Sequence, residues 1–461
     1  MIESALPISD SDESAATPRL TGSTAAHLGA LADQATALSW LGVPPVVQDR
    51  LLLVLFDTLG VMLAGARTSE VQALAGQFRE EGASILAGLG RTSTTDASCW
   101  VNGASVCALE LDEGSKYARG HPAAHVVPAA LAVGGGQDGA DWLAAVLVGY
   151  ETAARFGRAT RLRPGVHPHG TWGATGAAAA AGKLAGLDRE GIMTAVDAAC
   201  GLALAPHFES AFTGSPVRNL WVGAANIAGL TAVRLATSGA IMTGDTAAYT
   251  FGEILGDFDP EALAVPFDDQ PEILGGYFKR HAACAYTHSA ADAALALRAE
   301  QPVDPDRIEN ITVETYAIAA TLNRTEWPTR LAAMFSIPYV VAVTLIDGAF
   351  GPDATTQTRR EDPAVRELAC RVEVKATDEF EQRLPEQRGS RVTVRTTDGS
   401  QRSAEVTQPV GDSAHQPLGW NEIRDKLGDL IGAERTTRLE TTVRALPSEP
   451  VDVLFEELTR R

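Results

Sequence analysis

Two histidines stand on a turn rich in proline and glycine, His167-Pro168-His169-Gly170, and an alanine-rich stretch typical of a helix follows directly. Proline restricts φ and glycine permits close approach of the backbone, so the turn would hold both imidazoles at the N-terminus of that helix. The helix dipole and the free N–H groups there favour an anion. The turn predicts a site for a carboxylate substrate; a packed helix with two structural histidines is the alternative.

A second group of ionisable residues lies in a short stretch of the chain. Positions 109–116 read Leu-Glu-Leu-Asp-Glu-Gly-Ser-Lys, and Arg119, His121 and His125 follow. Histidine titrates near neutral pH, so an imidazole beside a carboxylate suits acid–base catalysis, whereas a solvated acidic turn is the alternative. His121 and His125 have the spacing of a zinc helix, but no HExxH glutamate lies between them. We therefore predict no metal site.

Three further segments carry groups that would bind an anion or line a pocket. Arg218 follows Gly214-Ser215-Pro216 at an expected helix start, where a guanidinium and a helix dipole together grip a carboxylate. Lys279 precedes Cys284 in one short run, and Tyr339 lies among apolar residues. The alternatives are a surface arginine and a tyrosine packed in the core.

The composition favours a mainly helical protein. Hydrophobic residues make up 45% of the chain and aromatic residues only 6%, so small aliphatic side chains must fill the interior, as in closely packed helices. Apolar patterning predicts buried helices at 48–64, 141–156 and 217–238, the last ending near Gly239.

The pattern changes after Lys279. Alternating residues predict strands at 310–316 and 371–374, and Asp398-Gly399 predicts a hairpin between 391–397 and 401–407. Helical segments at 288–299 and 335–347 lie among these strands, and helices at 420–430 and 451–461 follow them. We predict a mainly α fold with three parts: a disordered leader (1–21), a large helical domain (22–275 and 412–461) and a smaller α+β lid domain (276–411).

Charge and cysteine content narrow the possible partners. The net charge of −20 argues against nucleic acid, which requires a basic surface. Five cysteines without CxxC spacing fit a reducing cytoplasm, and no secretory leader or membrane-spanning stretch is expected. No glycine-rich fingerprint for a dinucleotide or a nucleoside triphosphate is present. We expect a cytoplasmic protein that contacts neither nucleic acid nor membrane.

Seven segments in register resemble the MmgE/PrpD family, which includes 2-methylcitrate dehydratase, cis-aconitate decarboxylase and iminodisuccinate epimerase. The resemblance covers nearly the whole chain after the leader. The segments are FDTLGVMLAG (56–65), LDEG with GHPAAHVVPAALA (111–132), GYE (149–151), HPHGTWGATGAAAAAGKLAGLD (167–188), the Arg218 helix, FKR with THSAADA (278–293), and FSIPYVVA (335–342). It implies a helical domain plus an α+β lid, a site between them, and a homodimer through the helical domain.

The resemblance also implies roles for single residues. It places Asp112 and His121 in the site, together with His167 or His169 and, from the lid, Lys279. Tyr339 matches a tyrosine that closes the pocket.

Three departures leave the particular reaction open. Where the dehydratases and decarboxylases of the family have an Asp-Asp-Thr-like run, this chain has Asp112-Glu113-Gly114-Ser115. Arg218 replaces a lysine of the decarboxylases, and Cys284 replaces their lid histidine.

The shared chemistry of such enzymes creates a carbanion next to a carboxylate, so cations must neutralise its charge and histidines must move the proton. We expect a cofactor-free lyase acting on a small di- or tricarboxylate, in the first place a hydro-lyase that dehydrates a 2-methylcitrate-like acid. Epimerisation and decarboxylation are the alternatives within enzymes, and a catalytically silent metabolite-binding protein is the alternative outside them. The expected catalytic residues are Asp112, His121, His167, His169 and Lys279, and the expected substrate-binding residues are Lys116, Arg119, Arg218, Cys284 and Tyr339.

We further expect the lid to hinge near Gly275-Gly276 and near 410–412, so that closure brings Lys279 toward His121 and the His167–Gly170 turn.

Overall fold

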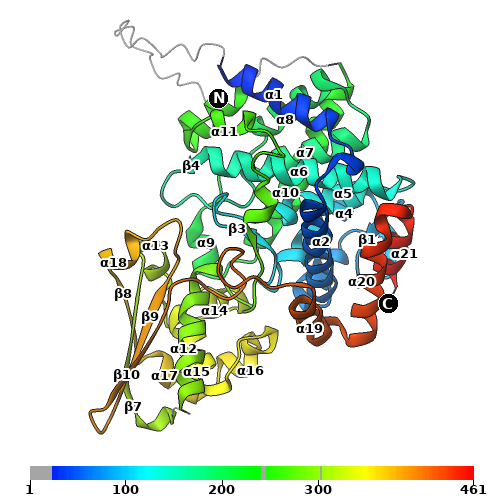
Figure 1. Cartoon of the computed structure of the whole chain (residues 1–461). Coiled ribbons are helices and arrows are strands. Elements are labelled where there is room, and N and C mark those ends of the chain that lie inside the picture. The colour runs from blue at the N-terminus through cyan, green and yellow to red at the C-terminus, as the bar shows by residue number, and fades with distance from the viewer. Residues whose placement is uncertain (1–22, 240–244, 302–303, 461) are drawn as a thin grey trace, which may run out of the picture.

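A computed structural model describes residues 23–239, 245–301 and 304–460. The predicted leader at 1–21 lies outside these residues. Helices dominate the chain and the strands are few and short, which confirms the expected fold class (Figure 1). The division into a helical domain and a lid with the predicted boundaries stays a prediction.

The helical body surrounds six long helices that pack on one another. They are α2 (Pro45–Gly65), α4 (Thr95–Cys107), α5 (Pro122–Val133), α6 (Gly139–Ala159), α7 (Gly173–Leu184) and α10 (Val217–Thr237). Small residues permit this packing: a Cβ added at Gly176 of α7 would lie only 2.5 Å from the Gly149 carbonyl oxygen of α6. The helices expected at 48–64, 141–156 and 217–238 correspond to α2, α6 and α10, and Gly239 after α10 has a φ of +83°.

Further helices and strands complete the body. The helices are α1 (Ser23–Ala37), α3 (Ser69–Ala75), α8 (Arg189–Gly201), α9 (Phe208–Phe212) and α11 (Glu261–Ala264). The strands form two small antiparallel pairs, β1 (Ser84–Leu86) with β2 (Arg91–Ser93) and β4 (Thr160–Leu162) with β5 (Gly256–Phe258).

The C-terminal helices return to the body beside α2 (Figure 1). They are α19 (Trp420–Ile431), α20 (Ala433–Ala445) and α21 (Asp452–Thr459). Lys426 of α19 donates to the buried Asp57 of α2 at 2.7 Å and to the Leu111 carbonyl oxygen at 2.9 Å. This C-terminal lysine thus ties α2 to the residue that precedes Asp112.

One four-stranded sheet lies in the C-terminal half. Its order is β10-β9-β7-β8, with β8 parallel to β7 and the other neighbours antiparallel. The strands are β7 (Ile308–Thr315), β8 (Val372–Ala376), β9 (Ser390–Thr396) and β10 (Gln401–Val406). The predicted strands and hairpin are confirmed, and Gly399 in the turn has a φ of +83°.

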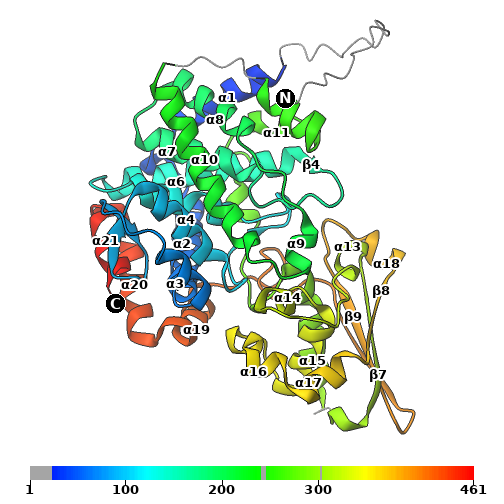
Figure 2. The ribbon, with the colours of Figure 1, turned by 180° about the vertical axis from the view of Figure 1, so that it is seen from behind.

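Helices cover one face of this sheet (Figures 1 and 2). The helix α12 (His288–Glu300) contacts β9 and β10, and α15 (Ile337–Asp347) contacts β8. The remaining helices of this part are α13 (Ala317–Ala320), α14 (Arg330–Met334), α16 (Gln357–Arg360), α17 (Pro363–Ala369) and α18 (Asp378–Glu381).

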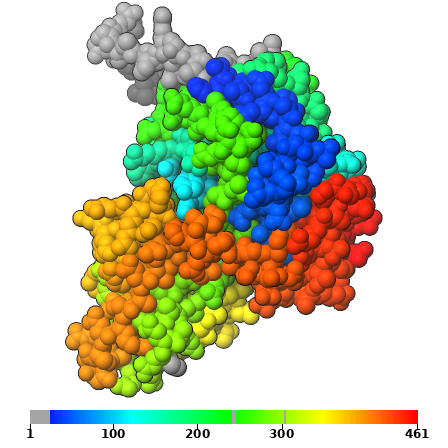
Figure 3. All heavy atoms as spheres, viewed as in Figure 1, coloured from blue at the N-terminus to red at the C-terminus, as the bar shows by residue number. Residues whose placement is uncertain are grey.

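The chain enters and leaves this sheet-containing part at neighbouring points. On entry, β6 (Gly276–Tyr277) pairs with β3 (Gly114–Ser115). On return, the Gly411 carbonyl oxygen accepts from the Phe278 N–H at 3.1 Å. Figure 3 shows the orange chain between β10 and α19 crossing the front of the molecule below the blue N-terminal helices. The two expected hinge segments therefore lie against each other.

By length and composition, α10 could cross a membrane, and so could the bent pair of α2 and α3 counted as one span. No membrane-spanning stretch was expected from the sequence. A helix buried in a protein core passes the same test, and half of the apolar window of α10 is buried among neighbours that include α4, α5, α7 and α8.

Candidate active site

His121 and Asp112 form the centre of a buried cluster. His121 immediately precedes α5, which begins with Pro122, and its Nδ1 lies 2.7 Å from the Glu113 carbonyl oxygen and 3.0 Å from Asp112 Oδ2. A carbonyl oxygen only accepts hydrogen bonds, so Nδ1 carries the proton. In the neutral ring, Nε2 is then the basic nitrogen, available to accept a proton from a substrate.

Burial sets the charge of this histidine. Burial lowers the pKa of His121 to about 4, although the negative charge of Asp112 acts in the opposite direction. For Asp112 the neighbouring charges outweigh burial. Burial raises the pKa of this carboxyl group, but the positive groups around it, Lys279 and Arg218 among them, hold the pKa below its usual value. At neutral pH the cluster therefore contains a neutral imidazole beside an ionised carboxylate.

Two cations face these groups from different parts of the chain. Lys279 follows β6, and its Nζ lies 3.4 Å from Asp112 Oδ1 and 3.3 Å from Glu110 Oε2. Arg218 stands in the first turn of α10, as predicted, and forms an ion pair with the other oxygen of Glu110. Burial lowers the pKa of Lys279, but Asp112 and Glu110 together raise it above its ordinary value, so this lysine stays charged.

All four charged side chains lie inside the protein. Lys279 is 0% exposed, and Glu110, Asp112 and Arg218 are each 1% exposed. Charges attract more strongly in such a medium than in water, so the four groups hold one another tightly. Glu110 also has a φ of +53°, a left-handed conformation that costs energy for a residue with a side chain. The fold thus keeps this carboxylate between the two cations.

The His167–Gly170 turn reaches the cluster through His169. The His169 ring centroid lies 4.9 Å from that of His121, 4.7 Å from that of His167 and 5.2 Å from that of His125. His169 is 0% exposed, and neither ring nitrogen has a hydrogen-bond partner among the described residues. Burial lowers its pKa well below the usual value. A buried imidazole with two unpartnered nitrogens is what a site for a polar ligand requires.

The other two histidines have local partners. His167 packs against Phe208 and Trp221, and its Nδ1 accepts from the backbone N–H of His169 at 3.1 Å. His125 has Nδ1 at 2.8 Å from the His121 carbonyl oxygen, and its Nε2 accepts from the Gly170 N–H at 3.3 Å. These rings support the arrangement of His121 and His169.

Three predicted binding residues are not brought to the cluster. Lys116 Nζ pairs with Asp412 at 3.1 Å. Arg119 is exposed and donates to the Thr160 carbonyl oxygen, and the Tyr339 hydroxyl donates to the Ala354 carbonyl oxygen at 2.5 Å.

Cys284 does lie near the cluster. Burial raises the pKa of its thiol to about 12, and the charges of Glu110, Lys279 and Arg218 also act on it. The thiol is therefore protonated at neutral pH.

Two family models match this chain: the MmgE/PrpD N-terminal domain over residues 29–252 and the MmgE/PrpD C-terminal domain over residues 281–446. The chain belongs to the MmgE/PrpD family. It is similar to the cis-aconitate decarboxylase of Aspergillus terreus, with 27% identity over 85% of this chain and 86% of that protein. It is also similar to the cis-aconitate decarboxylase-like protein oryM of Aspergillus oryzae (26% identity; 90% of this chain, 93% of that protein) and to human cis-aconitate decarboxylase (28%; 70% of each).

Two acidic residues that were not selected from the sequence also belong to the buried cluster of this MmgE/PrpD protein. Glu110 joins Arg218 and Lys279. Glu113 accepts from the Tyr150 hydroxyl at 2.5 Å and from the Ala123 N–H at 3.2 Å, and burial raises its pKa to about 7. The density of carboxylates at 110–113 was the available signal, but their partners lie far away in the sequence.

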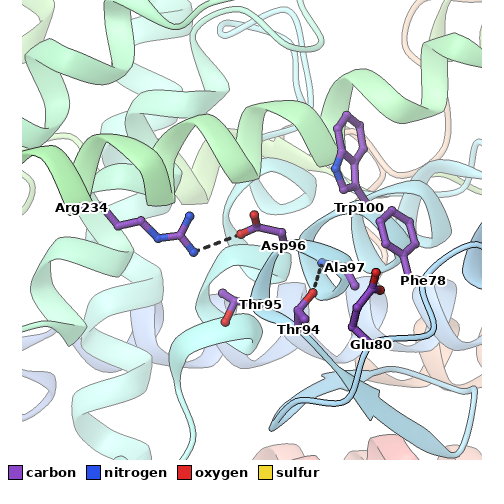
Figure 4. A pocket seen from close by; sticks show the side chains of 8 residues that line it. All are labelled: Phe78, Glu80, Thr94, Thr95, Asp96, Ala97, Trp100 and Arg234. Atoms are coloured by element: carbon purple, nitrogen blue, oxygen red, sulfur yellow. Dashed lines mark hydrogen bonds and ion pairs between the residues drawn. The ribbon is translucent and has the colours of Figure 1, made fainter.

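A separate surface pocket lies at the start of α4 (Figure 4). It encloses about 550 Å³ and is lined by Phe78, Glu80, Thr94, Thr95, Asp96, Ala97, Trp100 and Arg234. Thr94 caps the helix by accepting from the Ala97 N–H at 3.2 Å, and Arg234 pairs with Asp96 at 3.0 Å. No residue of the histidine cluster lines it, and its arginine is already paired, so we take the buried cluster as the candidate site of this MmgE/PrpD protein.

Within the described ranges, no group of three or more histidine, cysteine or acidic side chains is arranged to hold a metal ion.

Proposed function

We propose that this protein is a lyase that acts on a tricarboxylate by forming a carbanion next to a carboxylate. The observation that carries the proposal is the position of neutral His121, with Nδ1 held by the Glu113 carbonyl oxygen and Nε2 basic, in a buried cluster that also contains Lys279. The relatives named cis-aconitate decarboxylase support a tricarboxylate as substrate.

Decarboxylation is the reaction that these relatives favour. The bond between carbon and the departing carboxylate breaks, carbon dioxide leaves, and the electron pair stays on the substrate. Lys279 and Arg218 would stabilise the negative charge in the buried site. A proton must then reach the carbon. A bound tricarboxylate adds negative charge next to His121 and His169 and so raises both imidazole pKa values, which allows an imidazolium to deliver that proton.

Dehydration is the second candidate, and Cys284 is the reason to keep it. The decarboxylases that the chain resembles have a histidine at this position, whereas the Cys284 thiol, with a pKa of about 12, does not exchange protons readily at neutral pH. In a dehydration, His121 would remove the proton beside the carboxylate. An imidazolium of His169 would protonate the departing hydroxyl group, which leaves as water.

Both reactions require the closed site to open. Because Asp112, His169 and Lys279 are each at most 1% exposed, a substrate reaches them only after the chain segments at Gly276 and Gly411 move. The incoming carboxylates would then compete with Glu110 for the two cations. We propose that no metal or organic cofactor takes part, because imidazoles and fixed cations supply proton transfer and charge stabilisation. A homodimer and a cytoplasmic location stay predictions.

The experiment that tests the proposal uses EDTA-treated protein and several polycarboxylates in deuterated water. Release of carbon dioxide from cis-aconitate with deuterium in the product identifies a decarboxylase. A new alkene from 2-methylcitrate identifies a dehydratase, and deuterium uptake with inversion and no new product identifies an epimerase. Failure to turn over any tricarboxylate, with folded protein, contradicts the proposal.

A further inference from the structure

Arg388 is a cation beside the cluster that has no salt-bridge partner among the described residues, although the Tyr277 ring and the negative charge of Asp412 act on it. It lies in the loop between α18 and β9, its Nε is buried without a hydrogen-bond partner, and it takes part in none of the ion pairs among the described residues. Two other cations in this region do have carboxylate partners: Lys116 pairs with Asp412, and Lys279 pairs with Asp112. A buried guanidinium N–H without an acceptor is costly unless a ligand supplies one.

One aromatic ring joins Arg388 to the catalytic cluster. The guanidinium carbon of Arg388 lies 4.8 Å from the centroid of the Tyr277 ring. Tyr277 is two residues before Lys279 and pairs with Gly114, which is two residues after Asp112. A Cβ added at Gly114 would lie 2.5 Å from both Cζ and the hydroxyl oxygen of Tyr277, so the glycine makes room for this ring. Arg388 is thus one side chain away from the catalytic loop.

The surroundings of Arg388 offer further hydrogen-bond donors. Gln408 is 2% exposed; its Oε1 accepts from the backbone N–H of Arg388 at 3.3 Å, while its Nε2 is buried without a partner. Burial raises the pKa values of Tyr277, Tyr286 and Tyr316, and the positive charge of Arg388 acts in the opposite direction on all three. The three phenols stay protonated and can donate. Donors without acceptors around a cation fit an anion of several oxygens.

We propose that Arg388 binds a carboxylate of the substrate, namely one remote from the reacting carbon, and thereby selects tricarboxylates over dicarboxylates. This inference rests on the proposed function. Arg218 and Lys279 would hold the carboxylate beside the reacting carbon, with the Tyr277 ring between the two carboxylate positions. Arg388 does not take part in the chemical step; it binds and positions the substrate.

Calorimetric titration of the full chain tests this assignment without turnover. The probes are propane-1,2,3-tricarboxylate and the matched dicarboxylate propane-1,3-dicarboxylate. Arg388→Gln should weaken binding of the tricarboxylate about ten-fold or more, the usual effect of losing a charge-assisted hydrogen bond, and should change binding of the dicarboxylate little. Arg388→Lys should recover part of the loss. The matched control is Arg383→Gln, because Arg383 lies five residues away on the surface and pairs with Glu379 and Glu405; it should bind both probes as wild type does.

Kinetics separate this inference from the proposed function. With a tricarboxylate that the wild type turns over, Arg388→Gln should raise KM about ten-fold and leave kcat within a factor of about two. Wild-type turnover combined with unchanged KM and unchanged binding in Arg388→Gln overturns the role of Arg388 alone. Equal losses for both probes, or a melting temperature well below that of Arg383→Gln, would assign Arg388 to the packing of Tyr277 and also overturn it. If the wild type neither binds nor turns over a tricarboxylate, the proposed function itself fails.

Discussion

Asp112 Oδ2 lies 3.0 Å from Nδ1 of His121, and the same nitrogen lies 2.7 Å from the Glu113 carbonyl oxygen. The two oxygens belong to consecutive residues of one loop: the Glu113 carbonyl oxygen fixes the tautomer by its hydrogen bond, and the Asp112 carboxylate places a negative charge beside the same nitrogen. The other nitrogen, Nε2, is left for the substrate. Asp112 would also stabilise the imidazolium that forms when Nε2 takes a proton.

His121→Ala, Asp112→Asn and Lys279→Ala should each lower kcat by about two orders of magnitude or more, the usual effect of removing a positioned acid–base or electrostatic group. The three residues meet in one buried cluster, so each change removes a different part of the same chemistry. Steady-state kinetics of folded variants provide the measurement. His415→Ala is the control, because this histidine is exposed. Near-full turnover in His121→Ala and Lys279→Ala would show that the reaction takes place elsewhere.

Much of the fold could be predicted from local sequence patterns. Features that depend on contacts between distant parts of the chain could not. The apolar patterning of α2, α6 and α10 and the Asp398-Gly399 turn are visible within short windows of sequence. The helix α20 was missed because it is rich in charged and threonine residues, and few apolar side chains such as Leu439 and Val443 mark its buried face.

In the candidate site, too, single residues could be predicted from local motifs, but contacts between distant residues could not. Asp112, His121, His169 and Lys279 were selected from motifs, and the structure brings them together. The run of carboxylates at 110–113 marks Glu110 in the sequence, but its role depends on Arg218 and Lys279, which only the folded chain brings to it.

The pH dependence of kcat/KM should reflect the buried state of His121. Burial lowers its pKa from 6.5 to about 4, so the basic neutral form persists well below neutral pH and is lost only as the pH falls through about 4. The acidic limb of the profile should therefore lie closer to pH 4 than to pH 6.5. Rate measurements from pH 3.5 to 8, with a check that the protein stays folded, test this. An acidic limb at about 6.5 would indicate that the base is exposed in the free enzyme.

Arg218→Lys should raise KM about ten-fold while lowering kcat less than Lys279→Ala does, because lysine keeps the charge but loses the two-pronged grip of the guanidinium on a carboxylate. The matched control is Arg234→Lys on the same helix, where the arginine is largely exposed and pairs with Asp96. Melting temperatures of both variants belong to the experiment, since Arg218 is buried. A fall in kcat as large as that of Lys279→Ala would contradict this expectation, because it would show that the transition state needs the guanidinium itself and not only its charge.

Exhaustive chelation should leave the activity intact. Lys279 and Arg218 provide the positive charge that a metal ion would otherwise supply to a developing carbanion. Dialysis against EDTA, followed by metal analysis and a turnover assay, gives the result directly. Stoichiometric zinc or iron that is lost together with the activity, and that restores it on addition, would contradict this expectation.

Gly411→Ala should disturb the return crossing from the sheet-containing part to the body. Gly411 has a φ of +100°, and a Cβ there would lie 1.9 Å from the Phe278 carbonyl oxygen, next to Lys279. Left-handed strain and overpacking together should cost about 3 kcal/mol of unfolding free energy, and turnover should fall as Lys279 is displaced. Gly399→Ala is the control: its φ is +83° but nothing lies within 4 Å, so only the strain of about 1 kcal/mol applies. Urea unfolding and steady-state kinetics of both variants decide the matter, and equal losses in the two would show that contact with Phe278 does not hold the crossing in place.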